Sequence, residues 1–213
     1  MEGSKAVASA VIDCNLEKVE ELVSSLVKQG LSPAAIIDDG LIAGMNVVGE
    51  RFKTGEMYLP EVMMAAKAVK SCMNMLKPLL KGSDCMEKGI VVLGTVAGDK
   101  HDIGKNLVGM IMESSGFTVI DLGVDVVAES FIKAIREFNP HILGLSALLT
   151  TTMKEMKTTI DLLTTEGLRD SVKVIVGGAP VTSSFADSIG ADGWAPDAAS
   201  AKDLIVALML KKQ

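Results

Sequence analysis

Aromatic residues, cysteines and runs of like charge are scarce in this sequence. Phe, Trp and Tyr make up only 3% of the 213 residues, although 48% of the chain is hydrophobic. A buried core must therefore consist mainly of Val, Ile, Leu, Ala and Met. The three cysteines, Cys14, Cys72 and Cys85, have no metal-like spacing, so we expect reduced thiols in a cytoplasmic protein.

No long basic run is present, and the formal net charge is −6. These features argue against a nucleic-acid-binding surface, which is usually basic. The longest apolar runs are too short to span a membrane, and no basic segment followed by an apolar one opens the sequence. We therefore expect no nucleic-acid partner, no membrane anchor and no secretion signal.

The first part of the chain has the apolar spacing of helices. Asn15 is expected to cap one helix and Ser32 a second, while a third begins near Pro60 after a break at Gly55. Helices of this length predict a small antiparallel four-helix bundle over residues 1–80. Gly40, Gly44 and Gly49 are costly inside a helix, so we expect close packing against a neighbour to compensate.

Residues 81–88 are polar and lack periodicity, and we interpret them as a linker. After them, short apolar runs alternate with amphipathic segments. The expected strands are GIVVLGTV, FTVIDLG, HILGLSAL, VKVIVGG and DGWA, and the expected helices span about 104–115, 127–139, 151–166, 181–189 and 198–211. This alternation predicts an α/β domain over residues 89–213 with a flavodoxin-like (Rossmann-like) five-stranded parallel sheet.

Three loops should meet at the carboxyl edge of that sheet, where doubly wound folds bind ligands. They contain GDKHDIG, GLSALLTTTM and VGGAP. Asp99 and His101 are two residues apart, so in an extended loop their side chains share one side and can form a hydrogen bond. Such a bond fixes the imidazole tautomer and leaves the other nitrogen as a metal ligand or base. Thr152 can extend this chain of hydrogen bonds.

Each of these signals also has a plainer explanation. A single loop histidine is usually only solvated, a double glycine after a strand is usually only a turn, and Ser146 at a strand end is more often a cap. His141 opens a strand after Pro140, and we interpret it as structural. The joint placement of the other residues on three successive crevice loops favours a binding site.

The motif Asp99-x-His101-x-x-Gly104, with Ser146-x-Leu148 after 41 residues and Gly177-Gly178 after 28 more, resembles the cobalamin-binding signature of base-off/His-on corrinoid proteins. The segment MNVVGERFKTGEMYLPEVMMAAKAV resembles the cap of methionine synthase and of small corrinoid proteins in methanol, methylamine and methoxy-compound methyltransferase systems. The resemblance covers nearly the whole chain. It implies a four-helix cap, a short linker and a flavodoxin-like corrinoid domain.

The resemblance implies that His101 is the lower axial ligand of cobalt, in place of the cofactor's nucleotide base. Asp99 and a hydroxyl group are then expected to tune the imidazole; the family usually has Ser at that position, where this chain has Thr152. Gly177 and Gly178 are expected to keep open the slot for the displaced base. The residues implied to contact the cofactor are Gly98, Asp99, Lys100, His101, Asp102, Ile103, Gly104, Ser146, Leu148, Thr150, Gly177, Gly178, Ala198, Phe52 and Leu59.

Phe52 and Leu59 are the residues that the resemblance places over the methyl group, with Met57, Tyr58 and Met63 at their border. Such an apolar lid would limit solvent access. Without the family match, Met and Phe at helical spacing are more often core residues. The lid must move aside for an enzyme, and the linker is the expected hinge.

The resemblance implies a corrinoid protein that alternates between methyl-Co(III) and Co(I) and does not turn over alone. Its expected partners are a substrate-specific methyltransferase, an acceptor methyltransferase that uses tetrahydrofolate or a thiol, and a reductive activase. The sequence leaves the donor open among methylamines, quaternary amines, methanol and aryl methyl ethers.

Three other functions compete with this carrier. A small subunit of an adenosylcobalamin-dependent mutase typically lacks the cap segment RFKTGEMYLPEV. A cobalamin-based light sensor usually has a DNA-binding domain before the cap. A flavin-binding electron carrier needs a phosphate-binding loop, for which GDKHDIG is a poor candidate. The methyl carrier is the favoured hypothesis.

Overall fold

A computed structural model describes residues 2–80 and 88–210. Residues 81–87 lie outside this description, so the linker and its hinge stay predictions. The described chain forms two compact units: the residues up to 88 together with 110–116, and residues 89–109 together with those from 117 onward. Among the described helices, none has the length and apolar composition that a membrane span needs.

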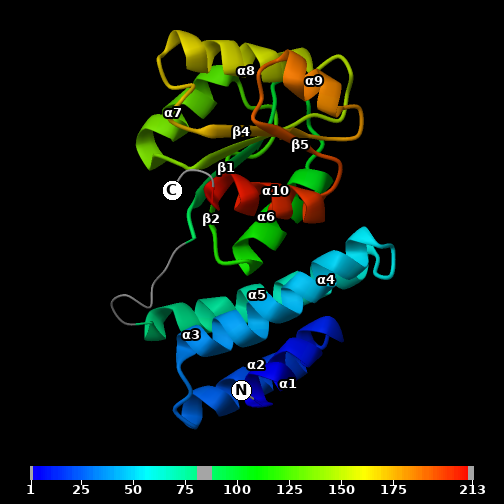
Figure 1. Ribbon diagram of the computed structural model, residues 1–213, viewed down its shortest axis with the longest axis vertical. Coiled ribbons are helices and arrows are strands. Elements are labelled where there is room, and N and C mark those ends of the chain that lie inside the picture. The colour runs from blue at the N-terminus through cyan, green and yellow to red at the C-terminus, as the bar shows by residue number, and fades with distance from the viewer. Residues whose placement is uncertain (1, 81–87, 211–213) are drawn as a thin grey trace. The chain divides into compact units, whose positions relative to one another are not determined.

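The first unit is helical, as predicted (Figure 1). The helical segments are α1 Glu2–Ile12, α2 Leu16–Lys28, α3 Pro33–Ile36, the π-helical η1 Ile37–Ile42, α4 Ala43–Lys53, α5 Leu59–Leu76 and the 3-10 turn η2 Lys77–Leu79. The Asn15 side chain accepts a hydrogen bond from the Lys18 N–H at 3.0 Å, which confirms the predicted cap of α2. Ser32 is the N-cap residue of α3 and Pro33 lies in its first turn, as predicted, although the Ser32 side chain makes no capping hydrogen bond.

Of the glycines Gly40, Gly44 and Gly49, the first two allow close packing against α1. A Cβ on Gly44 would lie 2.8 Å from the Ala8 carbonyl oxygen, and one on Gly40 would lie 3.1 Å from a methyl of Val7. Gly49 differs, because no described atom outside its own surroundings lies within 4 Å of such a Cβ. The packing prediction is therefore confirmed for Gly40 and Gly44 and wrong for Gly49.

This difference gives a matched pair of substitutions. Gly44→Ala is expected to destabilise the helical unit by about 1–3 kcal/mol, because the new methyl group overlaps the α1 backbone. Gly49→Ala is expected to stabilise the unit by up to about 1 kcal/mol, because alanine favours a helix and meets no neighbour. Urea unfolding followed by circular dichroism measures both. Equal changes in the two variants would contradict the packing role of Gly44.

Two cysteines can be placed in the helical unit. Cys14 and Cys72 are both free thiols. Burial, with a smaller contribution from Glu20, raises the pKa of the Cys72 thiol to about 12. A thiol that stays protonated is a poor nucleophile, so Cys72 is a core residue rather than a reactive one. Cys85 lies outside the described residues.

The second unit is built on a five-stranded sheet in which every pairing is parallel. The strands are β1 Ile90–Thr95, β2 Thr118–Asp121, β3 Ile142–Ser146, β4 Lys173–Gly177 and β5 Gly193–Ala195, in the order β2-β1-β3-β4-β5. This is the flavodoxin-like order predicted from the sequence. The His141 ring accepts a hydrogen bond from the Ile90 N–H at 3.2 Å, which confirms its structural role.

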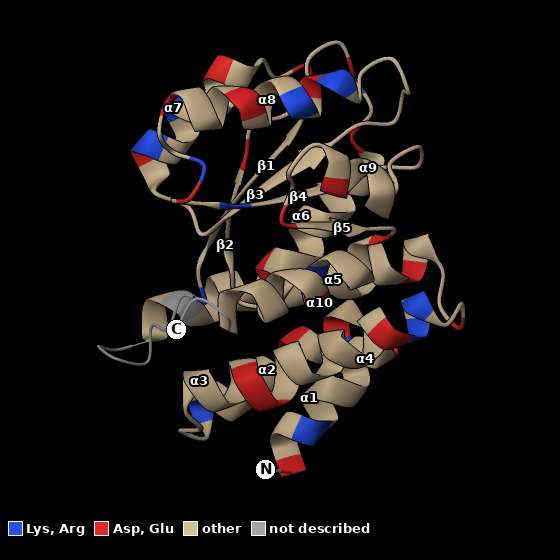
Figure 2. Ribbon diagram, turned by 45° about the horizontal axis from the view of Figure 1, so that its top comes forward, with Lys and Arg blue, Asp and Glu red and all other residues tan. Residues whose placement is uncertain are grey.

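Helices cover both faces of the sheet, as a parallel sheet requires. They are α6 Ile103–Ser114, α7 Ala128–Phe138, α8 Lys154–Thr165, α9 Ser183–Ser188 and α10 Ala198–Leu210. Figure 1 shows α7 and α8 on one face and α6 and α10 on the other. Residues of both charge signs mark α7 and α8 in Figure 2, as on solvated outer surfaces.

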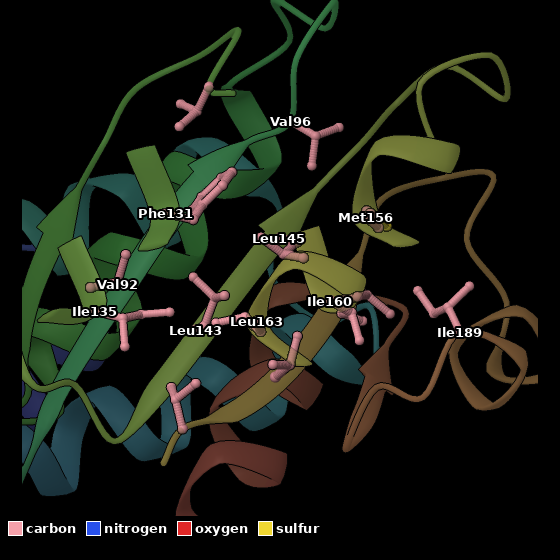
Figure 3. Close-up of a cluster of buried hydrophobic side chains, with 14 of the residues drawn as sticks. Val92, Val96, Phe131, Ile135, Leu143, Leu145, Met156, Ile160, Leu163 and Ile189 are labelled. Carbon is pink, nitrogen blue, oxygen red and sulfur yellow. The ribbon is translucent and has the colours of Figure 1, made fainter. Parts of the chain in front are cut away.

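An aliphatic core lies between the sheet and α7 and α8 (Figure 3). Phe131 is its one fully buried aromatic side chain among the described residues, and it lies against Gly94 of β1. A Cβ on Gly94 would come within 2.5 Å of the Phe131 ring. The core is otherwise aliphatic, with Met156 from α8, as the composition predicted. Residues of β1 and β3 belong to this core, and the loops described next follow these two strands.

Candidate functional site

Four residues stand side by side where the central strands end. Thr95 pairs with Ser146, Ser146 with Gly177, and Gly177 with Ala195. The loops that follow β1, β3 and β4 therefore leave the sheet at one edge, as predicted.

His101, Asp99 and Thr152 form a continuous hydrogen-bonded group. Nδ1 of His101 lies 2.7 Å from Oδ1 of Asp99, and the His101 backbone N–H donates to the same oxygen at 3.1 Å. The Thr152 hydroxyl donates to the other carboxylate oxygen at 2.8 Å. The predicted hydrogen bonds among these three residues are thus present.

Asp99 is fully buried. It also accepts hydrogen bonds from the N–H groups of Leu148, at 2.7 Å, and Leu149, at 3.2 Å. Burial alone would raise the pKa of Asp99, but the hydrogen bonds it accepts, above all from the His101 ring and then from Leu148, lower this pKa well below its ordinary value. Asp99 is therefore ionised at neutral pH, and as an acceptor it favours the imidazole tautomer that has its proton on Nδ1 and its lone pair on Nε2.

The His101 side chain is 52% exposed, and none of the described residues forms a hydrogen bond with its Nε2. Ile103, Leu148 and Leu149 expose large apolar side chains on the same loops. An available imidazole nitrogen with exposed apolar neighbours is typical of the mouth of a binding site.

A cavity of about 450 Å³ lies beside His101, within the range of small-molecule sites. Its walls come from the loops after β1, β3, β4 and β5 and from the start of α10. The predicted contact residues in these walls are Lys100, His101, Asp102, Ile103, Gly104, Ser146, Leu148, Gly177, Gly178 and Ala198. Three other predicted contacts, Gly98, Asp99 and Thr150, are not among the described lining residues, and neither is Thr152. Asp99 instead forms a hydrogen bond with the imidazole, and Thr152 forms one with Asp99.

Gly178 is needed for a reason that the sequence did not reveal. Its φ is +125°, and a Cβ there would lie 1.8 Å from the carbonyl oxygen of Ala147. The loop after β4 therefore passes directly against the loop after β3. Gly177 is less constrained, since a Cβ added to it would lie 3.2 Å from the carbonyl oxygen of Ala195.

The predicted lid residues belong to the helical unit. Phe52 is near the end of α4 and Leu59 begins α5, so a short turn places both at one end of that unit. Both are partly buried. Of their expected neighbours, Tyr58 is 70% and Met63 is 44% exposed, whereas Met57 is buried in the helical core.

Three supporting features were missed from the sequence. The buried Thr95 hydroxyl donates to the His101 carbonyl oxygen at 2.9 Å. Asp125 binds the backbone of the GDKHDIG loop. Lys105, buried in the cavity wall, forms an ion pair with Asp121 at 2.6 Å that links α6 to the end of β2. A charged residue within an apolar helix was a signal for Lys105, but no local pattern marks the other two.

The site fits a metal that is held by a macrocycle. Among the described residues, no cluster of His, Cys, Asp and Glu side chains could hold a bare metal ion. A single imidazole with a fixed tautomer suits an axial position on a transition metal, and the adjacent cavity has room for part of a large cofactor. The fold and this site define a cofactor-binding protein of the doubly wound α/β class.

Comparison with known proteins gives the family. The B12 binding domain matches residues 89–202, and a second B12 binding domain matches residues 4–77. The dimethylamine corrinoid protein of Methanosarcina barkeri is 47% identical over 204 residues, which cover 93% of this chain and 95% of that protein.

Two solved structures support this assignment. A cobalamin-binding protein from Desulfitobacterium hafniense DCB-2 matches with a TM-score of 0.81 and 37% identity, covering 96% of this chain and 98% of that one. A chain of the methanol:cobalamin methyltransferase complex MtaBC from Methanosarcina barkeri matches with a TM-score of 0.87 and 33% identity, covering 98% and 80%. The chain belongs to the B12-binding corrinoid proteins, and its cofactor is cobalamin or a related corrinoid.

Proposed function

We propose that this protein carries a methyl group on its corrinoid between two methyltransferases. The first removes the group from a small methylated substrate, and the second passes it to tetrahydrofolate or a thiol. Cobalt in a corrin ring supplies a centre that accepts and releases a methyl group. A reductive activase is the proposed third partner, because reduced cobalt is readily oxidised.

The observation that carries this proposal is the hydrogen bond of 2.7 Å between Asp99 and Nδ1 of His101. It orients an imidazole whose Nε2 can ligate cobalt in place of the nucleotide base, which is base-off/His-on binding. The displaced base and its arm would then occupy the cavity walled by Ser146, Gly177 and Gly178. The role of Asp99 and Thr152 is to hold the imidazole in this tautomer and orientation.

The relatives favour a methylated amine or an alcohol as the donor. One is named a dimethylamine corrinoid protein, and another is part of a methanol:cobalamin methyltransferase complex. The identity over nearly the whole length is greater for the first, so we propose dimethylamine as the first donor to test. Phe52 and Leu59 remain our proposed contacts for the upper face of the corrin.

Reconstituted methyl transfer tests the proposal. The protein is loaded with cobalamin, reduced, and mixed with ¹³C-dimethylamine and a dimethylamine-specific methyltransferase. Carbon NMR is expected to show the label on the corrinoid only when all components are present, and on a thiol after an acceptor methyltransferase is added. Methanol, quaternary amines and aryl methyl ethers with their own methyltransferases form the comparison series. Cobalamin binding without methyl transfer from any donor in the series would contradict the carrier function.

A further inference from the structure

The loop that carries His101 is held by a residue from a neighbouring loop. Asp125, between β2 and α7, accepts a hydrogen bond on Oδ1 from the Gly98 N–H at 2.6 Å. Its own N–H donates to the carbonyl oxygen of Asp99 at 2.9 Å. One residue therefore binds the backbone of Gly98 and of Asp99, two residues before His101.

Asp125 adopts a backbone conformation that most residues avoid. Its φ is +55°, in the left-handed region. Glycine takes this conformation without strain, and Asn and Asp take it more readily than other residues. Glycine at this position would lack the carboxylate that binds Gly98. Aspartate combines the required backbone conformation with the side-chain bond, which indicates that the bond itself has a role.

The other hydrogen bonds that hold this loop do not reach Gly98. The Thr95 hydroxyl fixes the His101 carbonyl group from β1, and Leu148 with Thr152 fixes the Asp99 carboxylate from the β3 side. Gly98, at φ +78°, precedes both of these anchored groups in the sequence, and neither anchor reaches it. Asp125 supplies the anchor from the β2 side.

We propose that Asp125 is a positioning residue for the axial histidine. By fixing Gly98 and the Asp99 carbonyl group, it sets the direction from which the Asp99 carboxylate meets Nδ1 of His101, and therefore where Nε2 points. This inference rests on the proposed function, in which Nε2 ligates cobalt. Asp125 acts through the loop and not on the imidazole itself.

Two substitutions at Asp125 and one control separate positioning from stability. Asp125→Gly removes the carboxylate and also removes the strain of a positive φ, which glycine adopts freely. Asp125→Asn keeps an oxygen acceptor for the Gly98 N–H and tolerates the same φ. Asn139→Gly is the control, because Asn139 has φ +44° at the end of α7 and lies on a different loop. Each protein is labelled with ¹⁵N-histidine and loaded with cobalamin reduced by one electron.

Two quantities are measured for each variant. The first is the free energy of unfolding in urea. The second is the fraction of the corrinoid that is ligated by histidine, which is the fraction of the electron paramagnetic resonance signal that shows ¹⁵N splitting. In Asp125→Gly, the ratio of histidine-ligated to unligated corrinoid is expected to fall about tenfold, while stability stays within the range of Asn139→Gly. Asp125→Asn is expected to restore most of the ligated fraction.

The outcomes are distinct. Absence of ¹⁵N splitting in the wild-type protein would contradict the proposed function. Splitting in the wild-type protein with an unchanged fraction in Asp125→Gly would overturn the positioning role alone. That role is also overturned if Asp125→Gly is unfolded where Asn139→Gly is folded, or if Asp125→Asn loses as much ligation as Asp125→Gly.

Discussion

Gly178→Ala is expected to destabilise the sheet unit by about 2 to 4 kcal/mol and to weaken cobalamin binding by more than about tenfold. An alanine Cβ would lie 1.8 Å from the Ala147 carbonyl oxygen, and its φ of +125° is one that L residues rarely adopt. The loops after β3 and β4 must therefore separate, and both line the cavity. Trp194 is the single tryptophan of the chain and precedes the lining residue Ala195, so quenching of its fluorescence measures binding.

Gly104→Ala is the matched comparison for this effect. Gly104 also lines the cavity, but a Cβ on it would meet no described neighbour within 4 Å, and its φ is not positive. The apoprotein is expected to keep its stability in urea while cobalamin binding weakens, because only the ligand's space is reduced. If Gly178→Ala were as stable as Gly104→Ala, the close approach of the two loops would not be what requires glycine.

His101→Ala is expected to remove the spectrum of an imidazole-ligated corrinoid and to lower cobalamin affinity by at least about tenfold, as loss of groups around a metal typically does. The fold should persist, because the side chain is about half exposed. Absorption spectra of the protein reconstituted with hydroxocobalamin measure the first effect, and Trp194 quenching measures the second.

His141→Gln provides the control for His101→Ala. His141 accepts a hydrogen bond from the Ile90 N–H, and a glutamine oxygen can accept a similar bond. This variant is expected to keep the spectrum of the unaltered protein. If His101→Ala bound cobalamin with an unchanged spectrum, the ligand assignment would be wrong.

The fold was predictable because the burial of a strand or helix determines the pattern of apolar residues in its sequence. Strands buried on both faces require continuous apolar runs, as in β1 and β3, and these runs alternate with amphipathic helices. The order of the strands followed from fold-class rules rather than from any residue. The lack of a side-chain bond at Ser32 and of a packing contact at Gly49 could not be predicted, because each depends on where neighbouring atoms lie.

In the site, contacts between residues close in sequence were predictable, whereas most contacts between different loops were not. The spacing of Asp99 and His101 implied their hydrogen bond, which both residues can form within one loop. Thr95 and Asp125 were missed because their partners are set by the path of the backbone, and Thr and Asp are ordinary residues at strand ends and turns. The ion pair between buried Lys105 and exposed Asp121 joins two residues that are 16 positions apart in the sequence, a pairing that periodicity does not report.

The most direct test of the central claim is electron paramagnetic resonance of the cobalamin-loaded protein after one-electron reduction, with and without ¹⁵N-histidine. Ligation by His101 predicts that each line changes from a nitrogen triplet to a doublet when the protein is labelled, and that the doublet persists in His141→Gln. A triplet that is unchanged in the labelled protein would show that the cofactor's own unlabelled base still binds cobalt, and would contradict ligation by His101.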